Sequence, residues 1–342
     1  MPPPFRIGVM QLTMEPLEEM LESARVMDRA GMDTIWLAEA YPWWRKHGME
    51  ARSSTVSSAL IAQATERLTI GWGIISPFTR HPVQIAMDAR VAQEAAGPAR
   101  FLLGLGTSKI FLNNAKLNSR KTLGPMREAV EIVRGVLGGA AFEYDGETFS
   151  ASVPPLRDEA ESPREVPPVY IGATAPKMQT LAGEIADGCL TPSITTPAFV
   201  RYTLGNVEAD VDIGCTVIAS IGEDRHAGRD GAREIAGMYL ANKFQNIKGA
   251  ADTLLELAGI EMEELQPVAE AMERGGRLAA KEQVTDELLD RCKPIAGTPA
   301  DCIEAIEEYK DAGCTHVMLE LWGEHRHEQI RLFGEQVLPH VR

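Results

Sequence analysis

Cysteine is scarce in this sequence, and basic residues are outnumbered by acidic ones. The five cysteines among 342 residues are odd in number and widely spaced, and no Cys-x-x-Cys pair occurs. This argues against a disulfide framework and against a structural zinc site. Lys and Arg total 34 against 49 Asp and Glu, so the formal net charge of −15 repels nucleic acid and anionic lipid surfaces. An anionic ligand therefore needs a local basic pocket.

Long apolar runs are also lacking. No apolar stretch approaches the length of a membrane span, and the proline-rich residues 1–5 have neither the basic nor the apolar region of a secretory signal. With 44% hydrophobic and 24% charged residues, the chain can bury a large core without disulfides. We therefore predict a cytoplasmic protein that binds neither nucleic acid nor a membrane.

Several catalytic signatures are missing as well. The sequence has no Ser in a G-x-S-x-G setting, no H-E-x-x-H and no G-x-G-x-x-G after the first expected strand. Residues 324–328 contain two histidines and two glutamates, but alternate histidines at the start of a helix are more often solvated than metal-bound. We predict no metal site. A site without a nucleophile favours chemistry carried by a cofactor.

Strand-like and helix-like segments alternate along the chain. Short apolar segments predict eight strands, at residues 6–10, 34–37, 68–72, 101–105, 169–171, 188–190, 212–220 and 316–319. Amphipathic segments predict helices at residues 16–30, 57–64, 83–96, 125–137, 177–186 and 299–312. Eight strands alternating with helices predict an α/β fold, a parallel (β/α)8 TIM barrel. A doubly wound open sheet is the alternative.

The chain is longer than a minimal barrel. Such a barrel needs about 250 residues, so we predict one barrel domain over residues 1–342 with insertions near residues 110–123, 140–166 and 222–290. An Asp-Gly pair within residues 142–149 predicts a tight hairpin outside the barrel. The sequence pattern assigns no arrangement to residues 222–290.

The barrel prediction locates the chemistry, because active sites of such barrels lie at the C-terminal ends of the strands. The residues that follow the expected strands are Met10, Gln11, Glu39, Ala40, Gly73, Ile74, Ser76, Gly106, Thr107, Ser108, Gly172 to Lys177, Thr191 and Glu320 to Trp322. Residues 171–177, I-G-A-T-A-P-K, offer backbone N–H groups and one ammonium at the start of a helix. This combination suits a phosphate group.

Three segments together resemble a known family. They are LTIGWGIISPFTRHP at 68–82, FLLGLG at 101–106, and VPPVYIGATAPKM at 166–178 followed by AGEIADG at 182–188. They are similar to the bacterial luciferase-like superfamily of flavin- and deazaflavin-dependent oxidoreductases, and most similar to methylenetetrahydromethanopterin reductase and its relatives. The resemblance implies a luciferase-like barrel and often a homodimer.

The resemblance also implies roles for individual residues. It implies a non-prolyl cis peptide at Gly73-Ile74, which in the family supports a bent isoalloxazine ring, and it places Glu39 near that ring. The cofactor-binding residues that it implies are Glu39, Gly73, Ile74, Ile75, Thr107, Ser108, Gly172, Ala173, Thr174, Ala175, Pro176 and Lys177. Of these, residues 172–177 are implied to hold the cofactor phosphate.

The implied activity is hydride transfer between coenzyme F420 and a small organic substrate. The alternative is an FMN-dependent monooxygenase, which uses oxygen and reduced flavin from a separate reductase. Acid and base groups of the named relatives are missing here, where Met10, Ala40, Lys109 and Thr174 stand instead. Glu39 and His81 are therefore the first candidates for catalytic residues. Aromatic residues at 40–47 are a candidate substrate lid or dimer contact.

Overall fold

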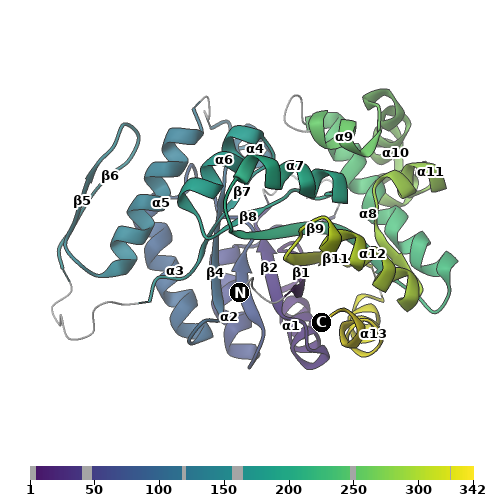
Figure 1. Ribbon diagram of the computed structural model, residues 1–342, viewed down its shortest axis with the longest axis horizontal. Helices are drawn as coiled ribbons and strands as arrows, with labels where there is room; N and C mark the ends of the chain where they lie inside the picture. The colour runs from purple at the N-terminus through teal and green to yellow at the C-terminus, as the bar shows by residue number, and fades with distance from the viewer. Residues whose placement is uncertain (1–4, 41–47, 118–120, 156–164, 247–251, 324) are drawn as a thin grey trace.

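A closed ring of parallel strands forms the centre of the molecule (Figure 1). The computed structural model describes residues 5–40, 48–117, 121–155, 165–246, 252–323 and 325–342. The ring consists of β1 (Arg6–Leu12), β2 (Thr34–Ala38), β3 (Thr69–Trp72), β4 (Phe101–Gly106), β7 (Val169–Gly172), β8 (Gly188–Leu190), β9 (Asp212–Ile221) and β11 (His316–Glu320). Pairing of β11 with β1 closes the ring. The predicted (β/α)8 barrel is confirmed, and each strand lies where the sequence predicts one.

Helices connect successive strands and surround the ring (Figure 1). They are α1 (Leu17–Ala30), α2 (Ser54–Ala64), α3 (Pro82–Ala96), α5 (Leu123–Gly138), α6 (Pro176–Ile185), α7 (Pro197–Val207) and α12 (Pro299–Asp311). The short α4 (Lys109–Asn114) follows β4, and α13 (Arg326–Gln336) and α14 (Leu338–Val341) end the chain. Each crossover runs from the end of one parallel strand to the start of the next, as a parallel barrel requires.

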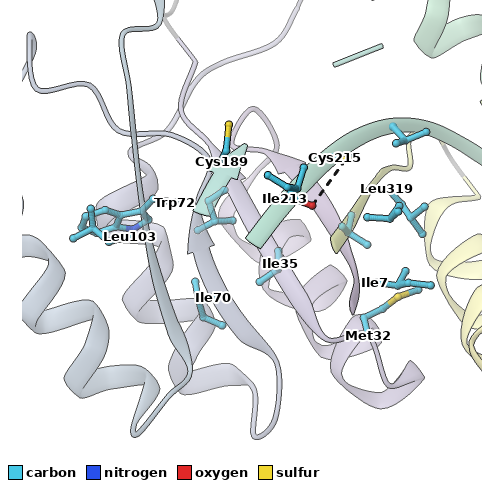
Figure 2. Packing of buried hydrophobic residues seen from close by; sticks show 14 of the residues in the cluster. Ile7, Met32, Ile35, Ile70, Trp72, Leu103, Cys189, Ile213, Cys215 and Leu319 are labelled. Carbon is cyan, nitrogen blue, oxygen red and sulfur yellow. Dashed lines mark hydrogen bonds between the residues drawn. The ribbon is translucent and has the colours of Figure 1, made fainter. Parts of the chain in front are cut away.

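The strands are apolar on both faces because both faces are buried. Residues facing the helices include Ile35, Ile70 and Leu319, which Figure 2 shows in one packed layer. The barrel interior is filled by a second set, comprising Met10, Trp36, Leu102, Tyr170, Leu190 and Met318. Alternate residues of a strand therefore belong to different layers, which follows from the two-residue period of a strand.

Gly71 makes room for the largest residue of the interior. A Cβ at residue 71 would lie 2.4 Å from the Trp36 ring, so a larger residue there would displace the indole. Trp72 points the other way, toward α2, where its Nε1 donates to Ser58 Oγ at 3.0 Å. The glycines of the third strand therefore serve the packing of the barrel as well as the region beyond it.

β9 is longer than the barrel needs. Its residues up to Ile218 pair within the ring, and Ala219 to Ile221 pair with the additional strand β10 (Ile295–Gly297). Between these two strands lie α8 (Arg225–Asn246), α9 (Asp252–Ala258), η3 (Met262–Leu265), α10 (Gln266–Lys281) and α11 (Asp286–Arg291). The described helices of the segment 222–290 thus form a helical layer beside the barrel (Figure 1), and their apolar residues pack in a second core cluster together with barrel residues such as Phe199 and Ile218.

The predicted tight hairpin is present. β5 (Phe142–Asp145) and β6 (Ser150–Val153) pair antiparallel and project from the barrel (Figure 1). Gly146 N donates to Phe149 O at 3.0 Å, so two residues form the tip of the turn. The Glu128 carboxylate on α5 accepts hydrogen bonds from the backbone N–H groups of Glu147, Thr148 and Phe149 at 3.1, 2.9 and 2.8 Å and so holds the turn.

The cysteines are free and buried. They belong to the apolar packing; Figure 2 shows Cys189 and Cys215 on neighbouring strands. Within the described ranges, no helix is long and apolar enough to span a bilayer.

Candidate functional site

The chain changes course where β3 ends. The peptide Gly73-Ile74 is cis, which confirms that prediction. Gly73 N donates to Leu37 O of β2 at 2.9 Å, whereas Ile75 N donates to Gly104 O of β4 at 2.9 Å. Gly106 N in turn donates to Ile75 O at 3.1 Å. The backbone therefore crosses from one neighbouring strand to the other at the C-terminal end of the barrel.

Three glycines leave a surface of backbone around the Ile74 side chain. A Cβ at Gly106 would lie 2.6 Å from Ile74 Cγ1, and one at Gly172 would lie 3.0 Å from Ile74 Cγ2. A Cβ at Gly73 would lie 3.0 Å from Met10 Cε. We call Gly73, Ile74, Gly106 and Gly172 the glycine shelf. The absence of side chains at residues 106 and 172 makes room for the Ile74 side chain against the backbone.

Glu39 lies beside the shelf and is paired. Both of its carboxylate oxygens accept hydrogen bonds from Arg80, at 2.6 and 2.7 Å. The Glu39 side chain is only 9% exposed, and its hydrogen bonds are the main cause that raises the pKa of Arg80. The sequence placed both residues near the ends of β2 and β3, but it gave no sign of this bidentate pair.

His81 caps a helix. Its Nδ1 accepts a hydrogen bond from the backbone N–H of Val83 at 3.3 Å at the start of α3, and its exposed ring meets the edge of Phe149 with centroids 5.7 Å apart. These contacts place His81 between α3 and the hairpin. The catalytic role predicted for it stays a prediction.

The loop after β4 joins the loop after β3. Ser76 Oγ donates to Thr107 O at 3.2 Å, and Ser108 takes the left-handed conformation, with φ of 48°, directly before α4. Thr107 and Ser108 therefore lie next to the shelf at the C-terminal end of the barrel, where the sequence predicted them.

The loop after β7 presents unused donors. Ala173 N donates to Leu190 O at 2.9 Å. The backbone N–H groups of Thr174, Ala175 and Lys177 have no hydrogen-bond partner within the described parts of the chain, and Pro176 has no N–H to offer. Lys177 also lines a small pocket of about 190 Å³ with Arg127. These donors at the start of α6 fit a phosphate group.

Glu320 is a functional candidate that the sequence placed at the end of a strand but to which it assigned no role. It ends β11, and it shares the inward face of that strand with Met318 of the barrel interior. Its side chain is 1% exposed and accepts hydrogen bonds from Ser193 Oγ at 3.0 Å, from Trp322 Nε1 at 3.1 Å and from the Tyr239 hydroxyl. The sequence feature that could have identified Glu320 is that it is a single acidic residue at the end of an apolar strand.

A buried cation accompanies this carboxylate. Burial raises the pKa of Glu320 to about 7, although its three donors and Lys243 oppose the shift. Burial also lowers the pKa of the Lys243 ammonium to about 8, with Glu320 opposing. The Glu320 carboxylate and the Lys243 ammonium, both among the described residues, lie more than 4.0 Å apart and form no salt bridge with each other. Both groups therefore change protonation near neutral pH.

No metal centre stands out in the residues that the structure describes, since no three His, Cys, Asp or Glu side chains gather there. His325 and Glu328 are exposed and lie 3.6 Å apart. Residues 41–47, the candidate lid, lie outside the described residues, as do parts of the three expected insertions.

The family follows from comparison of the sequence with known families. Residues 3–316 match the luciferase-like monooxygenase family. This chain belongs to that family. The predicted superfamily, and the prediction of an enzyme of this class, are confirmed.

Individual relatives cover nearly the whole chain. It is 28% identical over 334 residues to 5,10-methylenetetrahydromethanopterin reductase of Archaeoglobus fulgidus, covering 93% of this chain and 94% of the reductase. It is 25% identical over 358 residues to F420-dependent glucose-6-phosphate dehydrogenase of Nakamurella multipartita, covering 100% and 98%. The coenzyme F420 dependent tetrahydromethanopterin reductase from Methanopyrus kandleri superimposes with a TM-score of 0.85 at 23% identity, covering 99% and 100%. That likeness shows the fold.

Proposed function

We propose that this protein is an oxidoreductase that moves a hydride between coenzyme F420 and a small organic substrate. The observation that carries the proposal is the glycine shelf at the C-terminal end of the barrel, the end at which the Glu39–Arg80 pair and the donor-bearing start of α6 also follow their strands. A flat ring with an anionic tail needs both features. Two relatives support this proposal. One is named an F420-dependent glucose-6-phosphate dehydrogenase, and the other is named a reductase.

The residues present fit this cofactor. The shelf would support the ring, Thr107 and Ser108 would line it, and residues 172–177 would hold the phosphate through backbone N–H groups and Lys177. When bound, F420 supplies a hydride at the central carbon of its ring. Glu39 would orient the ring, and Arg80 fixes Glu39 in place through two hydrogen bonds.

We also propose a homodimer. Large apolar side chains are exposed on the neighbouring helices α2 and α3, namely Val56, Leu60, Met87 and Val91, with exposures of 42 to 63%. A monomer rarely leaves such a group uncovered. We expect Val91→Glu to produce a monomer in light scattering after size exclusion, whereas Leu278→Glu, also exposed but on α10, leaves the mass unchanged. A wild-type monomer would contradict the proposal.

The cytoplasmic location stays a prediction.

The first experiment is a titration of the purified protein with F420 and, separately, with FMN, followed by tryptophan fluorescence. Trp322 is the reporter of choice because it donates to Glu320, whereas Trp72 points away from the site toward α2. Tight binding of F420 alone supports the proposal. Tight binding of FMN alone supports the alternative, an oxygen-dependent monooxygenase served by a flavin reductase. Binding of neither cofactor would refute both.

A further inference from the structure

The end of β11 holds a buried charged cluster that cofactor binding does not use. Glu320 receives hydrogen bonds from three elements: Ser193 after β8, Tyr239 on α8 and Trp322 beyond its own strand. The Tyr239 and Trp322 rings meet edge to face, with centroids 6.3 Å apart. The carboxylate is thereby held in one orientation at the mouth of the barrel, where this fold places its chemistry.

The cluster connects the buried carboxylate to the surface. Glu320 itself is 1% exposed, but Ser193, Tyr239 and Trp322 are each partly exposed. Ser193 is the useful link, because a hydroxyl both accepts and donates a hydrogen bond. A proton on Glu320 Oε1 can pass to Ser193 Oγ over the 3.0 Å contact while the Ser193 proton passes outward.

Lys243 supplies the second charge. It lies on α8, in the segment 222–290, and it is 8% exposed. Burial lowers the pKa of its ammonium, and the Glu320 carboxylate is the charge that raises it. Perturbed ionisable groups of this kind are typical of functional sites.

The two residues predicted as proton donors are otherwise engaged. Both oxygens of Glu39 hold Arg80, and the His81 Nδ1 caps α3. Glu320 is held by neutral donors and can gain or lose a proton without breaking a salt bridge. The groups facing it are Tyr239 and Lys243 of α8, Ser193 and Trp322.

We propose that Glu320 exchanges a proton with the substrate through the Ser193 hydroxyl, that Lys243 positions and stabilises its charged form, and that the substrate is a carbonyl compound interconverted with its alcohol. The proposal rests on the proposed function, because it takes the hydride from reduced F420. In this reaction the cluster supplies the proton that the substrate oxygen gains or loses.

The step balances. In reduction, the carbonyl carbon gains a hydride from the reduced deazaflavin, the C=O π bond breaks, and the carbonyl oxygen takes the Ser193 proton as Ser193 takes that of Glu320. The deazaflavin is oxidised by two electrons, and Glu320 becomes a carboxylate that faces the Lys243 ammonium. Glu320 regains its proton from solvent. Oxidation of the alcohol follows the same path in reverse.

The test begins without cofactor. Difference infrared spectroscopy of the whole protein should show a carboxyl band that titrates near neutral pH, that is absent in Glu320→Gln and that remains in Glu335→Gln, an exposed control. Lys243→Met should move the midpoint upward because a neighbouring positive charge is lost, and Lys243→Arg should restore it. A Glu320 midpoint below about pH 5 would overturn the proposal.

The second step uses reduced F420 with a panel of aliphatic aldehydes and ketones. We expect Glu320→Gln to lower kcat by about 10²- to 10⁴-fold with unchanged affinity for F420. We expect Ser193→Ala to lower kcat as well. Unchanged pH–rate profiles in Glu320→Gln, or no turnover of any carbonyl compound by wild type that binds F420, would refute this proposal alone. A wild-type protein that does not bind F420 would refute the proposed function, and this proposal with it.

Discussion

The two ends of strand β11 each hold a buried ionisable side chain. His316 begins the strand and Glu320 ends it, four residues later on the same inward face. Both side chains are fully buried or nearly so. Around His316 the charged groups are paired, whereas around Glu320 they are not. One strand thus shows what burial does to charge with and without a partner.

At the N-terminal end of the barrel, Asp212 is the centre of a network of paired groups. It accepts hydrogen bonds from Tyr170 at 2.7 Å, from Thr315 at 2.6 Å and from Arg6, with which it forms a salt bridge. Burial alone raises the pKa of Asp212, but these groups and His316 lower it far below its usual value. Burial also lowers the pKa of His316, which shares a hydrogen bond of 2.7 Å with Thr34 Oγ1.

At the C-terminal end, burial outweighs the contacts that oppose it. The Glu320 pKa is raised to about 7 and the Lys243 pKa is lowered to about 8, so both groups can exchange a proton near neutral pH. The first network stabilises the barrel, and the second leaves protons available at the end where reactions occur in this fold. The position along a strand, rather than burial itself, separates the two roles.

The largest expected effect is at the paired end. Asp212→Asn would leave the partly buried Arg6 guanidinium without its counter-charge, and we expect a loss of about 3 kcal/mol of unfolding free energy at pH 7. Because the folded-state pKa of Asp212 is lowered, the wild-type advantage is present above pH 4 and is lost as the pH falls further. Urea unfolding at several pH values measures it. Asp210→Asn, at an exposed neighbour, is the control, and an equal effect of both variants would contradict the network.

Glu320→Gln should act in the opposite direction. A carboxyl whose pKa rises from 4.5 to about 7 on folding lowers stability as the pH climbs through that interval, because the folded state holds the proton more tightly. The variant is therefore expected to gain about 3 kcal/mol relative to wild type between pH 5 and pH 8. Urea unfolding at both pH values tests this, with Glu335→Gln as the exposed control. A difference between variant and wild type that is equal at both pH values would show that Glu320 is already ionised.

The glycine shelf lies at the same end as Glu320 but has no charge. Gly106→Ala would place a Cβ 2.6 Å from Ile74 Cγ1 and force that side chain to move. We expect a loss of about 1 to 3 kcal/mol of stability and a weaker affinity for F420. Gly205→Ala, in α7 where a Cβ would meet open space, is the matched control for both measurements. Unchanged F420 affinity in Gly106→Ala would separate the shelf from cofactor binding.

How much the sequence predicted depends on the range of the interactions. The eight strands and the cis peptide follow from local patterns and from a resemblance that extends over contiguous motifs. The tight hairpin also follows from a local signal, whereas the three backbone hydrogen bonds that Glu128 of α5 accepts from its turn join distant residues and could not be predicted. Glu320 was not selected because its neighbours Ser193, Tyr239 and Lys243 come from distant parts of the chain, two of them in the segment 222–290 that the sequence pattern left unassigned.

The smallest expected effect concerns the ion pair beside the shelf. Glu39→Gln removes the charge that Arg80 binds with two hydrogen bonds, and we expect F420 affinity to fall by about 1 to 2 kcal/mol. Arg80→Gln should weaken binding similarly, and the double variant should lose less than the sum, because each single change removes the same pair. Isothermal titration with F420 measures all three variants. If Glu39→Gln changes neither affinity nor turnover, Glu39 does not orient the ring. Its pair with Arg80 then has a structural role, like the pairs around Asp212.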